Sequence, residues 1–379
     1  MMPESAPIKN FVLLIISSTL ALLAIAGLMQ VFIDPGKLYS SFHGVPTLQQ
    51  RKSETDFWET YKDRDILNSH DYGYDPELGW DIETTGDRIR GSKLISKVPD
   101  KSILRILAVG DSFTFGMDVG EHENFPYMLG KQIPRAEVLN MGVPGYGIDQ
   151  AYLKYRSYGR NYRPDVILFG VYVSDYERSS VTFTFYAKPK FTVTDGQLML
   201  TNQPVPTIQE SLKRIDASLA EKVYLFEILK NTVQKIKYAT KAKQHFFDEN
   251  NALITQIFSE LKSNLNDDQT LLIVHIPKGE SFIKKKPFRE EMNNNLVAIY
   301  EKLNIPYIDL RRAFMTDNIT PASALKNYYI VNSKGSVGHL SPRGHAKVAE
   351  LIAKSLKGEQ AISLDEAAVP LEKGKDLHL

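Results

Sequence analysis

Hydrophobic residues fall into short runs that alternate with amphipathic stretches over most of the chain beyond residue 100. The runs are rich in β-branched residues and leucine, which is typical of buried strands. They are Ile103–Val109, Ala136–Met141, Asp165–Val173, Thr270–Ile276 and Pro306–Leu310. Helices are predicted over Glu123–Ile133, Gln150–Tyr158, Glu290–Leu303 and Pro342–Leu356. This alternation predicts an α/β fold, with a mostly parallel sheet covered by helices on both faces.

Two regions depart from this alternation. Residues 34–100 are polar and predicted to be an irregular leader, with a compact aromatic turn cluster at Tyr72–Trp80. Residues 178–265 form an insertion, for which a lid is one interpretation. The insertion contains a turn-rich piece and two helical patterns, over Phe185–Pro206, Leu212–Lys237 and Asp248–Leu265. The main domain is therefore predicted over 101–357, followed by a charged, aperiodic and loose tail at 358–379.

An apolar segment without charged residues lies near the N-terminus, from Phe11 to Ile33. At ~1.5 Å per residue it is long enough to cross the ~30 Å hydrocarbon core of a bilayer. A cleaved signal peptide is the alternative, with Ala24-Ile25-Ala26 as the cleavage site. We favour an uncleaved anchor over residues 1–33, because the apolar run continues past Ala26. Either interpretation exports the rest of the chain.

The orientation of this anchor is not fixed by charge, because Lys9 precedes it and Lys37, Arg51 and Lys52 follow it. A single N-terminal anchor usually leaves the body of the protein outside the cytoplasm. We therefore predict a single-pass membrane protein with its main domain on the extracytoplasmic side.

Composition excludes several classes of partner and of catalytic site. The 379 residues include 46 Lys+Arg and 45 Asp+Glu, so a net charge of +1 argues against a nucleic-acid partner. The chain has no cysteine, which excludes disulfides, thiolate metal sites and a cysteine nucleophile. No H-E-x-x-H or G-x-G-x-x-G pattern occurs, so neither a metal nor a dinucleotide cofactor is expected.

The most informative motif is Gly110-Asp111-Ser112-Phe113-Thr114-Phe115-Gly116, directly after a predicted strand. Open α/β sheets bind ligands at the carboxyl ends of their strands, which is where Ser112 is placed. The hydroxyl of Ser112 would be exposed there, and backbone N–H groups that start the next helix would stabilise an oxyanion. The alternative is an ordinary turn with Ser112 as a helix cap.

Two other motifs carry candidate chemistry. A glycine-rich turn, Asn140–Gly147, follows the next predicted strand and is either a ligand-facing loop or a plain turn. Gly338–His345 immediately precedes the last helix, and His339 within it is a candidate general base at neutral pH. His345 lies on the helix and is expected to pack or cap.

The order of these motifs resembles the SGNH (GDSL-type) hydrolase family, of the membrane-anchored, envelope-associated type. The resemblance rests on GDSFTFG, NMGVPGYG, VSDYE and GHLSPRGHAKVAE, and covers roughly residues 74–357. The upstream segment Tyr74–Trp80 is similar to the leader of membrane- or envelope-linked members. It implies a flavodoxin-like three-layer α/β/α sandwich. It also implies Ser112 as nucleophile, His339 as its base, and the N–H groups of Ser112 and Gly142 as oxyanion donors.

The chain departs from the family pattern at two places. Ser174 stands where the family has an asparagine that is a third oxyanion donor. Val337 and Ser336 stand where the family has an aspartate that orients the histidine. The His339 ring would then be oriented by a backbone carbonyl or by a distant acid such as Asp175 or Asp309.

Three functions follow from these motifs. The first is an exported serine ester hydrolase that acts on an acylated carbohydrate or lipid without a cofactor. The second is an O-acyltransferase with the same Ser-His pair, which modifies an envelope polysaccharide. The third is a catalytically impaired module that keeps the fold for binding. The intact Ser112 and His339 favour the first two, whereas the missing asparagine and aspartate favour the third.

Overall fold

The computed structural model describes residues 73–82, 88–91, 95–220, 224–315 and 319–358, with scattered residues between 14 and 60. The chain divides into two compact units. One comprises Met1–Arg64 and Gln209–Phe246, and the other comprises Asp65–Ile208 and Phe247–Leu379. The predicted loose tail lies outside the described residues, apart from Gly358 at its start.

A five-stranded parallel sheet forms the centre of the second unit. Its strands are β3 (Leu104–Val109), β4 (Ala136–Asn140), β5 (Val166–Tyr172), β8 (Thr270–Ile276) and β9 (Tyr307–Asp309). Their order across the sheet, β4-β3-β5-β8-β9, is that of a flavodoxin-like fold. Every residue of β5 and β8 is buried, as expected for strands covered on both faces. The predicted α/β fold and parallel sheet are confirmed.

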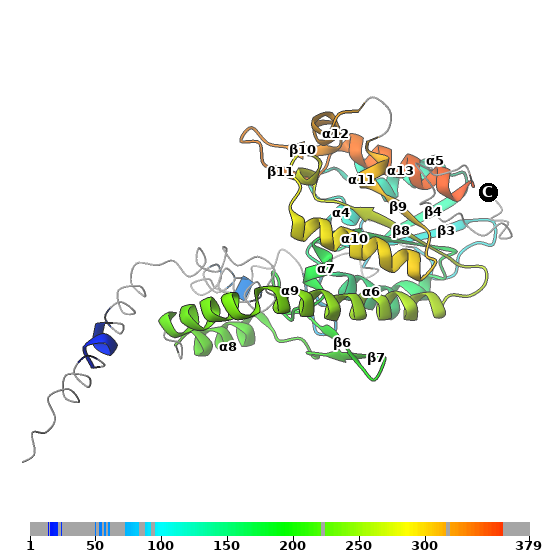
Figure 1. Cartoon of the computed structure of the whole chain (residues 1–379). Helices are drawn as coiled ribbons and strands as arrows, with labels where there is room; N and C mark the ends of the chain where they lie inside the picture. The colour runs from blue at the N-terminus through cyan, green and yellow to red at the C-terminus, as the bar shows by residue number, and fades with distance from the viewer. Residues whose placement is uncertain are drawn as a thin grey trace, which may run out of the picture. The chain divides into compact units, whose positions relative to one another are not determined.

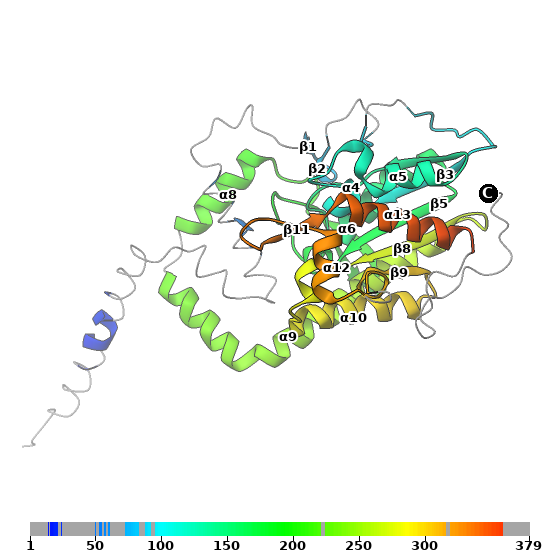
Figure 2. The ribbon, with the colours of Figure 1, turned by 90° about the horizontal axis from the view of Figure 1, so that it is seen from above.

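Helices cover both faces of this sheet (Figure 1). On one face, α5 (Phe125–Gln132) packs against α13 (Pro342–Leu356), and the bounds of α13 agree with the prediction. The other face carries α6 (Ile148–Ser157) and α10 (Pro287–Lys302). The long helix α9 (Tyr224–Ser263) also packs there, where Phe258 meets Phe169 of β5 at a ring distance of 5.2 Å. Figure 2 shows α5 and α13 in front of the strands from above.

Shorter elements complete the described chain. Antiparallel hairpins are formed by β1 (Gly73–Asp75) with β2 (Gly79–Asp81), β6 (Lys190–Thr194) with β7 (Gln197–Thr201), and β10 (Tyr329–Val331) with β11 (Val337–Leu340). The remaining helices are α4 (Ser112–Phe115), α7 (Asp175–Arg178), α8 (Ile208–Ala220), α11 (Leu310–Ala313) and α12 (Pro321–Tyr328), with 3-10 turns η2 (Glu121–Glu123), η3 (Gly159–Tyr162) and η4 (Gly279–Phe282).

The insertion differs from its prediction. Its turn-rich piece contains the β6–β7 hairpin, and its helices are α8 and a single continuous α9. The predicted gap between helices, 238–247, lies inside α9 because that stretch holds Ala, Lys and Gln and no Gly or Pro. The hydrophobic periodicity weakens there without a residue that breaks a helix.

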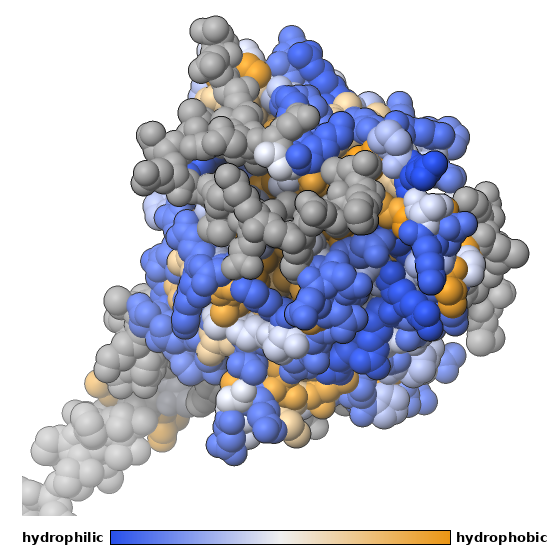
Figure 3. Space-filling view, turned by 90° about the vertical axis from the view of Figure 1, so that its right-hand side faces the viewer, coloured by the Kyte–Doolittle hydropathy of each residue, from blue (hydrophilic) through white to orange (hydrophobic). Residues whose placement is uncertain are grey.

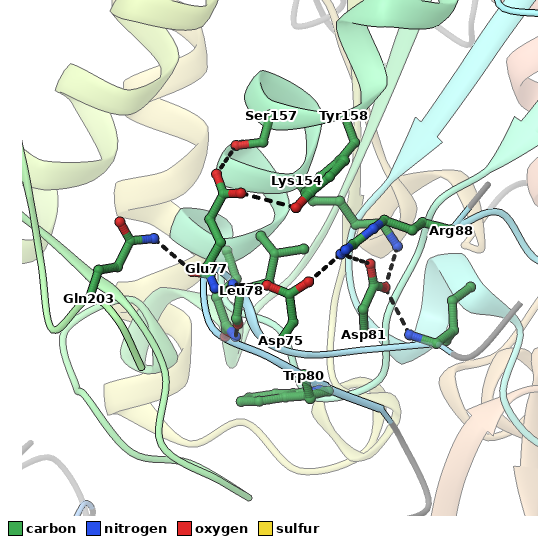
Figure 4. Close-up of polar contacts among 12 residues, drawn as sticks. Asp75, Glu77, Leu78, Trp80, Asp81, Arg88, Lys154, Ser157, Tyr158 and Gln203 are labelled. Carbon is green, nitrogen blue, oxygen red and sulfur yellow. Dashed lines mark hydrogen bonds and ion pairs between the residues drawn. The ribbon is translucent and has the colours of Figure 1, made fainter. Parts of the chain in front are cut away.

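The leader also differs, because it contains the β1–β2 hairpin and is not irregular throughout. Figure 4 shows this hairpin against α6. Lys154 of α6 is fully buried and its Nζ lies 2.6 Å from Asp81 Oδ1. Arg88 bridges Asp75 and Asp81, at 3.1 Å from the latter. Charges buried in this way require partners, so the hairpin is fixed to the sheet-bearing unit.

Among the described residues, no helix is long and apolar enough to cross a membrane. Most of the predicted anchor lies outside the described residues, and those described within it, such as Leu14 and Leu20, are helical and exposed. On the face of the molecule drawn in Figure 3, hydrophilic residues cover most of the described surface and hydrophobic ones form separate patches.

Candidate active site

Ser112 is the first residue of α4, at the carboxyl end of β3. Asp111 caps this helix, because its side chain accepts a hydrogen bond of 2.9 Å from the Phe113 N–H. The turn needs glycine before it: Gly110 has φ +152°, and a Cβ there would lie 2.7 Å from the carbonyl oxygen of Gly170. The strand, the cap and the glycine together place the Ser112 side chain at the sheet edge, as predicted.

His339 reaches Ser112 from the other end of the chain. It lies on β11, and its Nε2 is 2.9 Å from Ser112 Oγ. The Phe113 ring packs beside the imidazole at 4.9 Å, and Tyr172 stacks on Phe113 at 4.4 Å. Two residues more than two hundred positions apart are therefore within hydrogen-bonding distance, which is the arrangement that activates a serine nucleophile.

An acid that was not predicted from the sequence completes this pair. Asp118 Oδ2 lies 2.6 Å from Nδ1 of His339. With Nδ1 bound to a carboxylate, the imidazole carries its proton there and Nε2 is free to accept the proton of Ser112. Ser112, His339 and Asp118 therefore have the geometry of a catalytic triad, with the acid on the loop after α4.

A sequence signal for Asp118 did exist. It lies six residues after Ser112, in a short Gly-bounded turn where it adopts φ +69°. Asp is one of the few side-chain-bearing residues that tolerates this left-handed conformation. The family pattern instead places the acid just in front of His339, where this chain has Ser336 and Val337.

The two distant acids named as alternatives have other partners. Asp309 caps α11 and pairs with Arg311 at 2.7 Å. Asp175 accepts the Tyr172 N–H at 2.9 Å and pairs with Arg178 at 2.8 Å. Neither prediction is met, because each carboxylate is held by a neighbouring arginine on its own turn.

A second charged cluster lies directly behind the nucleophile. Arg178 Nη1 is 3.2 Å from Asp111 Oδ2, which in turn is 3.4 Å from Ser112 Oγ. Burial raises the pKa of Asp111 and of Asp175, and the nearby Asp111 raises that of Asp175 further. Arg178 opposes both shifts by attraction and thereby favours the ionised carboxylates.

Of the two predicted backbone oxyanion donors, Ser112 keeps a free N–H group and Gly142 does not. The Gly142 N–H donates to Asn140 Oδ1 at 3.0 Å, so it already has a partner. Glycine is required at 142 for another reason: a Cβ there would collide with the backbone of Thr114 and Phe115. Within the described part of the chain, the N–H groups of Ser112 and of Gly145 have no hydrogen-bond partner. Both N–H groups are therefore free to donate.

Ser174 and His345 complete the predicted residues. Ser174 is half-buried immediately before α7, beside the Tyr172 hydroxyl, and no contact joins it to Ser112. His345 packs and caps as expected, because its Nδ1 accepts the Phe125 N–H at 3.2 Å at the start of α5. Burial lowers the pKa of His345 to about 3.

Nothing among the described residues suggests a metal centre, since no group of three or more His, Asp or Glu side chains converges there. A cavity of about 970 Å³ lies at the amino ends of the strands, opposite to the end that carries Ser112. Its lining includes Ile103, Asp165 and Gln269. That cavity contains neither Ser112 nor His339. We therefore place the candidate site by the triad geometry and not by cavity size.

Comparison with known proteins gives similarity in structure but not in sequence. No protein-family model matches the chain, and no curated protein matches it. The structure is similar to the acetylxylan esterase Axe2 from Geobacillus stearothermophilus, with 15% identity, a TM-score of 0.39, and coverage of 69% of this chain and 97% of that one.

Two further solved structures are similar to a comparable degree. One is a member of the lipolytic protein G-D-S-L family from Veillonella parvula DSM 2008, with 14% identity, a TM-score of 0.38, and coverage of 67% of this chain and 96% of that one. The other is TesA, with 8% identity, a TM-score of 0.38, and coverage of 68% and 99%.

Proposed function

We propose that this chain is a serine ester hydrolase that uses Ser112, His339 and Asp118. The observation that carries the proposal is the hydrogen-bonded series Asp118–His339–Ser112, with distances of 2.6 and 2.9 Å. A module that only binds would have no need of an acid, a base and a hydroxyl in this order. The missing aspartate and the missing asparagine were the two reasons to consider such a module, and Asp118 answers the first of them, while Ser174 still stands at the position of the asparagine.

The reaction proceeds in two acyl transfers. Ser112 Oγ attacks the ester carbonyl carbon while its proton passes to His339 Nε2. The bond to the alcohol oxygen then breaks, and His339 returns the proton to the leaving alkoxide. Water attacks the acyl-serine with His339 again as base, which releases the carboxylic acid and restores Ser112. Asp118 keeps Nδ1 protonated and stabilises the imidazolium formed in each half.

The negative charge of the tetrahedral intermediate requires donors. The free N–H of Ser112 at the start of α4 is one, and that of Gly145 in the glycine-rich turn is a second candidate. Pro144 precedes Gly145, which has φ +85°, and the Tyr146 N–H donates to the Val143 carbonyl oxygen, which is the pattern of a type II turn. Each such donor contributes ~10²–10³-fold to turnover in related chemistry.

An active-site serine probe tests this function directly. We expect a fluorophosphonate to label the wild-type chain stoichiometrically and to leave Ser112→Ala unlabelled. Hydrolysis of p-nitrophenyl acetate should depend on Ser112 in the same way. Equal labelling of both proteins, or a wild type that neither labels nor hydrolyses, would reject the proposal.

The substrate class that we propose is an acylated carbohydrate or lipid. The four motif blocks that resemble SGNH hydrolases support it, since esters of this kind are the usual substrates of that family. A panel of acetylated oligosaccharides and acyl esters of increasing chain length separates the two, through kcat/KM for each substrate.

The location that we propose is the membrane, through residues 11–33, with the esterase unit outside the cytoplasm. The uncharged apolar run supports an anchor, and its described residues Leu14, Ile16 and Leu20 are helical and exposed. Membrane fractionation tests the anchor: removal of residues 1–33 should move the protein to the soluble fraction. A mature N-terminus at Gly27 would instead establish a cleaved signal peptide.

A further inference from the structure

Arg90, which follows the leader hairpin, contacts the loop that carries the catalytic acid. Its Nη1 donates to the carbonyl oxygens of Phe115 and of Gly116, the latter at 2.7 Å. Its Nη2 donates to the carbonyl oxygen of Val119 at 3.0 Å. The backbone N–H of Arg90 is itself fixed, through a 2.8 Å hydrogen bond to the Asn140 carbonyl at the end of β4. One guanidinium therefore joins three carbonyls to the sheet.

These carbonyls lie on both sides of Asp118. The loop leaves α4 at Gly116, which has φ +82°, and Asp118 then adopts φ +69°. A left-handed conformation is uncommon for a residue with a side chain and persists only where its surroundings hold it. The Asp118 side chain is 51% exposed, so packing contributes little to its position. The guanidinium contacts at Gly116 and Val119 hold the backbone on both sides of it, together with the 2.9 Å hydrogen bond from the Met117 N–H to the Ser112 carbonyl oxygen.

Arginine is suited to this role for geometric reasons. A guanidinium presents several donors in one plane at fixed angles, whereas an ammonium group is a point charge on a flexible stem. The Arg90 guanidinium also lies over the Phe115 ring at 4.3 Å, which restricts its rotation. Asn140 supports the same carbonyl of Phe115, through Nδ2 at 3.1 Å.

We propose that Arg90 is a positioning residue of the active site, which holds Asp118 within hydrogen-bonding distance of His339. The proposal rests on the proposed function, and it assigns part of the catalytic geometry to the leader segment in front of the α/β domain. Arg90 does not touch the reacting atoms, and it acts only through the loop of Gly116 to Val119.

A double-mutant cycle separates positioning from general support of the fold. We expect Arg90→Ala to lower kcat on p-nitrophenyl acetate by about 10- to 100-fold with little change in KM, because displacing a catalytic group by ~1 Å costs about that much. Arg90→Lys should lose less. In the Asp118→Asn background, Arg90→Ala should cost no more than about 2-fold, because the pair it positions is already lost. An equal loss in both backgrounds would overturn the proposal.

The matched control is Arg88→Ala, two residues earlier in the same segment. It removes the ion pairs with Asp75 and Asp81 but leaves the loop contacts of Arg90 intact. We expect it to lower the thermal midpoint of unfolding while kcat stays within about 2-fold of wild type. A loss of kcat as large as that of Arg90→Ala would show that the leader acts only through stability, and would contradict the proposal.

A second readout does not depend on ester hydrolysis. Proton NMR detects a far-downfield signal from an imidazole N–H bound to a carboxylate, and its absence in His339→Gln assigns it to His339. We expect this signal in wild type and in Arg88→Ala, and we expect it to be lost in Arg90→Ala and Asp118→Asn. If Arg90→Ala does not fold, Arg90→Gln is used in its place. An unchanged signal in Arg90→Ala, or no signal in wild type, rejects the proposal. This outcome is independent of the fluorophosphonate test, which examines only the proposed hydrolase function.

Discussion

Asp118 is the residue that most directly supports the interpretation of this chain as a serine hydrolase, and its substitution tests that interpretation. Asp118→Asn removes the carboxylate that accepts the hydrogen bond from Nδ1 of His339. The histidine is then no longer held in the tautomer that carries its proton on Nδ1. We expect kcat on p-nitrophenyl acetate to fall by ~10²–10⁴-fold, towards the loss known for the same change in serine proteases. KM should change little, since Asp118 contacts the histidine and not the substrate.

Asp195→Asn is the matched control for this change. Asp195 also has a positive φ, +50°, in the exposed turn between β6 and β7, so it tests the same substitution in the same backbone conformation. We expect wild-type turnover from it. If Asp118→Asn retained full activity, a different group would have to orient His339 and the triad would be wrong.

The residues of the site were predictable where chemistry and local sequence coincide. Ser112 and His339 each lie in a short motif next to a regular element, and the structure joins them. Asp118 was missed because its relation to His339 exists only in three dimensions. Gly142 was predicted to be an oxyanion donor, but its N–H group binds Asn140 and its missing side chain makes room for Phe115. The motif contains several glycines, and only the packing of the folded chain shows which of them has this structural role.

At the scale of elements, the attachment of the leader hairpin to α6 predicts an asymmetric response to mutation. Asp81 has two cationic partners, Lys154 and Arg88, whereas Lys154 Nζ has Asp81 alone among the described residues. Asp81→Ala therefore leaves a fully buried ammonium without a partner, and we expect a loss of ~3–5 kcal/mol in the free energy of unfolding. Lys154→Met should cost clearly less, because Asp81 keeps Arg88.

Urea unfolding of both variants measures this difference. Lys347→Met serves as control, because it removes a partly exposed ion pair with Glu350 at 3.1 Å and should cost under ~1 kcal/mol. A Lys154→Met variant less stable than Asp81→Ala would show that Arg88 does not satisfy Asp81, and that the hairpin is attached by other contacts.

The elements themselves were predicted with unequal success, for physical reasons. Strands β5 and β8 are buried on both faces and appear in the sequence as mostly apolar runs, so their bounds were close to correct. The β1–β2 hairpin was not foreseen, because three-residue strands carry almost no periodicity. Its polar residues Asp75 and Asp81 resemble a solvated loop in sequence, although both are buried in ion pairs.

At the scale of the whole molecule, burial of histidines makes stability depend on pH. His345 lies in the interface between α13 and α5, and burial lowers its pKa to about 3. In the unfolded chain it would titrate near its ordinary value of 6.5. Between these values the unfolded state binds a proton that the folded state does not. The contribution of His345 to stability is therefore fully present above pH 6.5 and is lost as pH falls towards 3.

The buried carboxylates act in the opposite direction, so a single pH titration of the wild type would not isolate His345. Burial raises the pKa of Asp111, Asp149 and Asp175, and each of these groups favours the folded state as pH falls. They are unchanged in a variant at position 345. The difference in stability between wild type and such a variant therefore cancels them and leaves the histidine.

His345→Gln is the suitable variant, because glutamine does not titrate and its side-chain oxygen is able to accept the Phe125 N–H that His345 Nδ1 now accepts. We expect the stability gap between wild type and His345→Gln to shift by about 2 kcal/mol in favour of the variant between pH 8 and pH 5. This is the free energy by which protonation of the histidine stabilises the unfolded state at pH 5, about 1.5 pH units below its ordinary pKa. Urea unfolding of both proteins at the two pH values measures it. A gap that stays constant would mean that His345 takes up its proton in the folded state, and that the interface between α13 and α5 opens to water at mildly acidic pH.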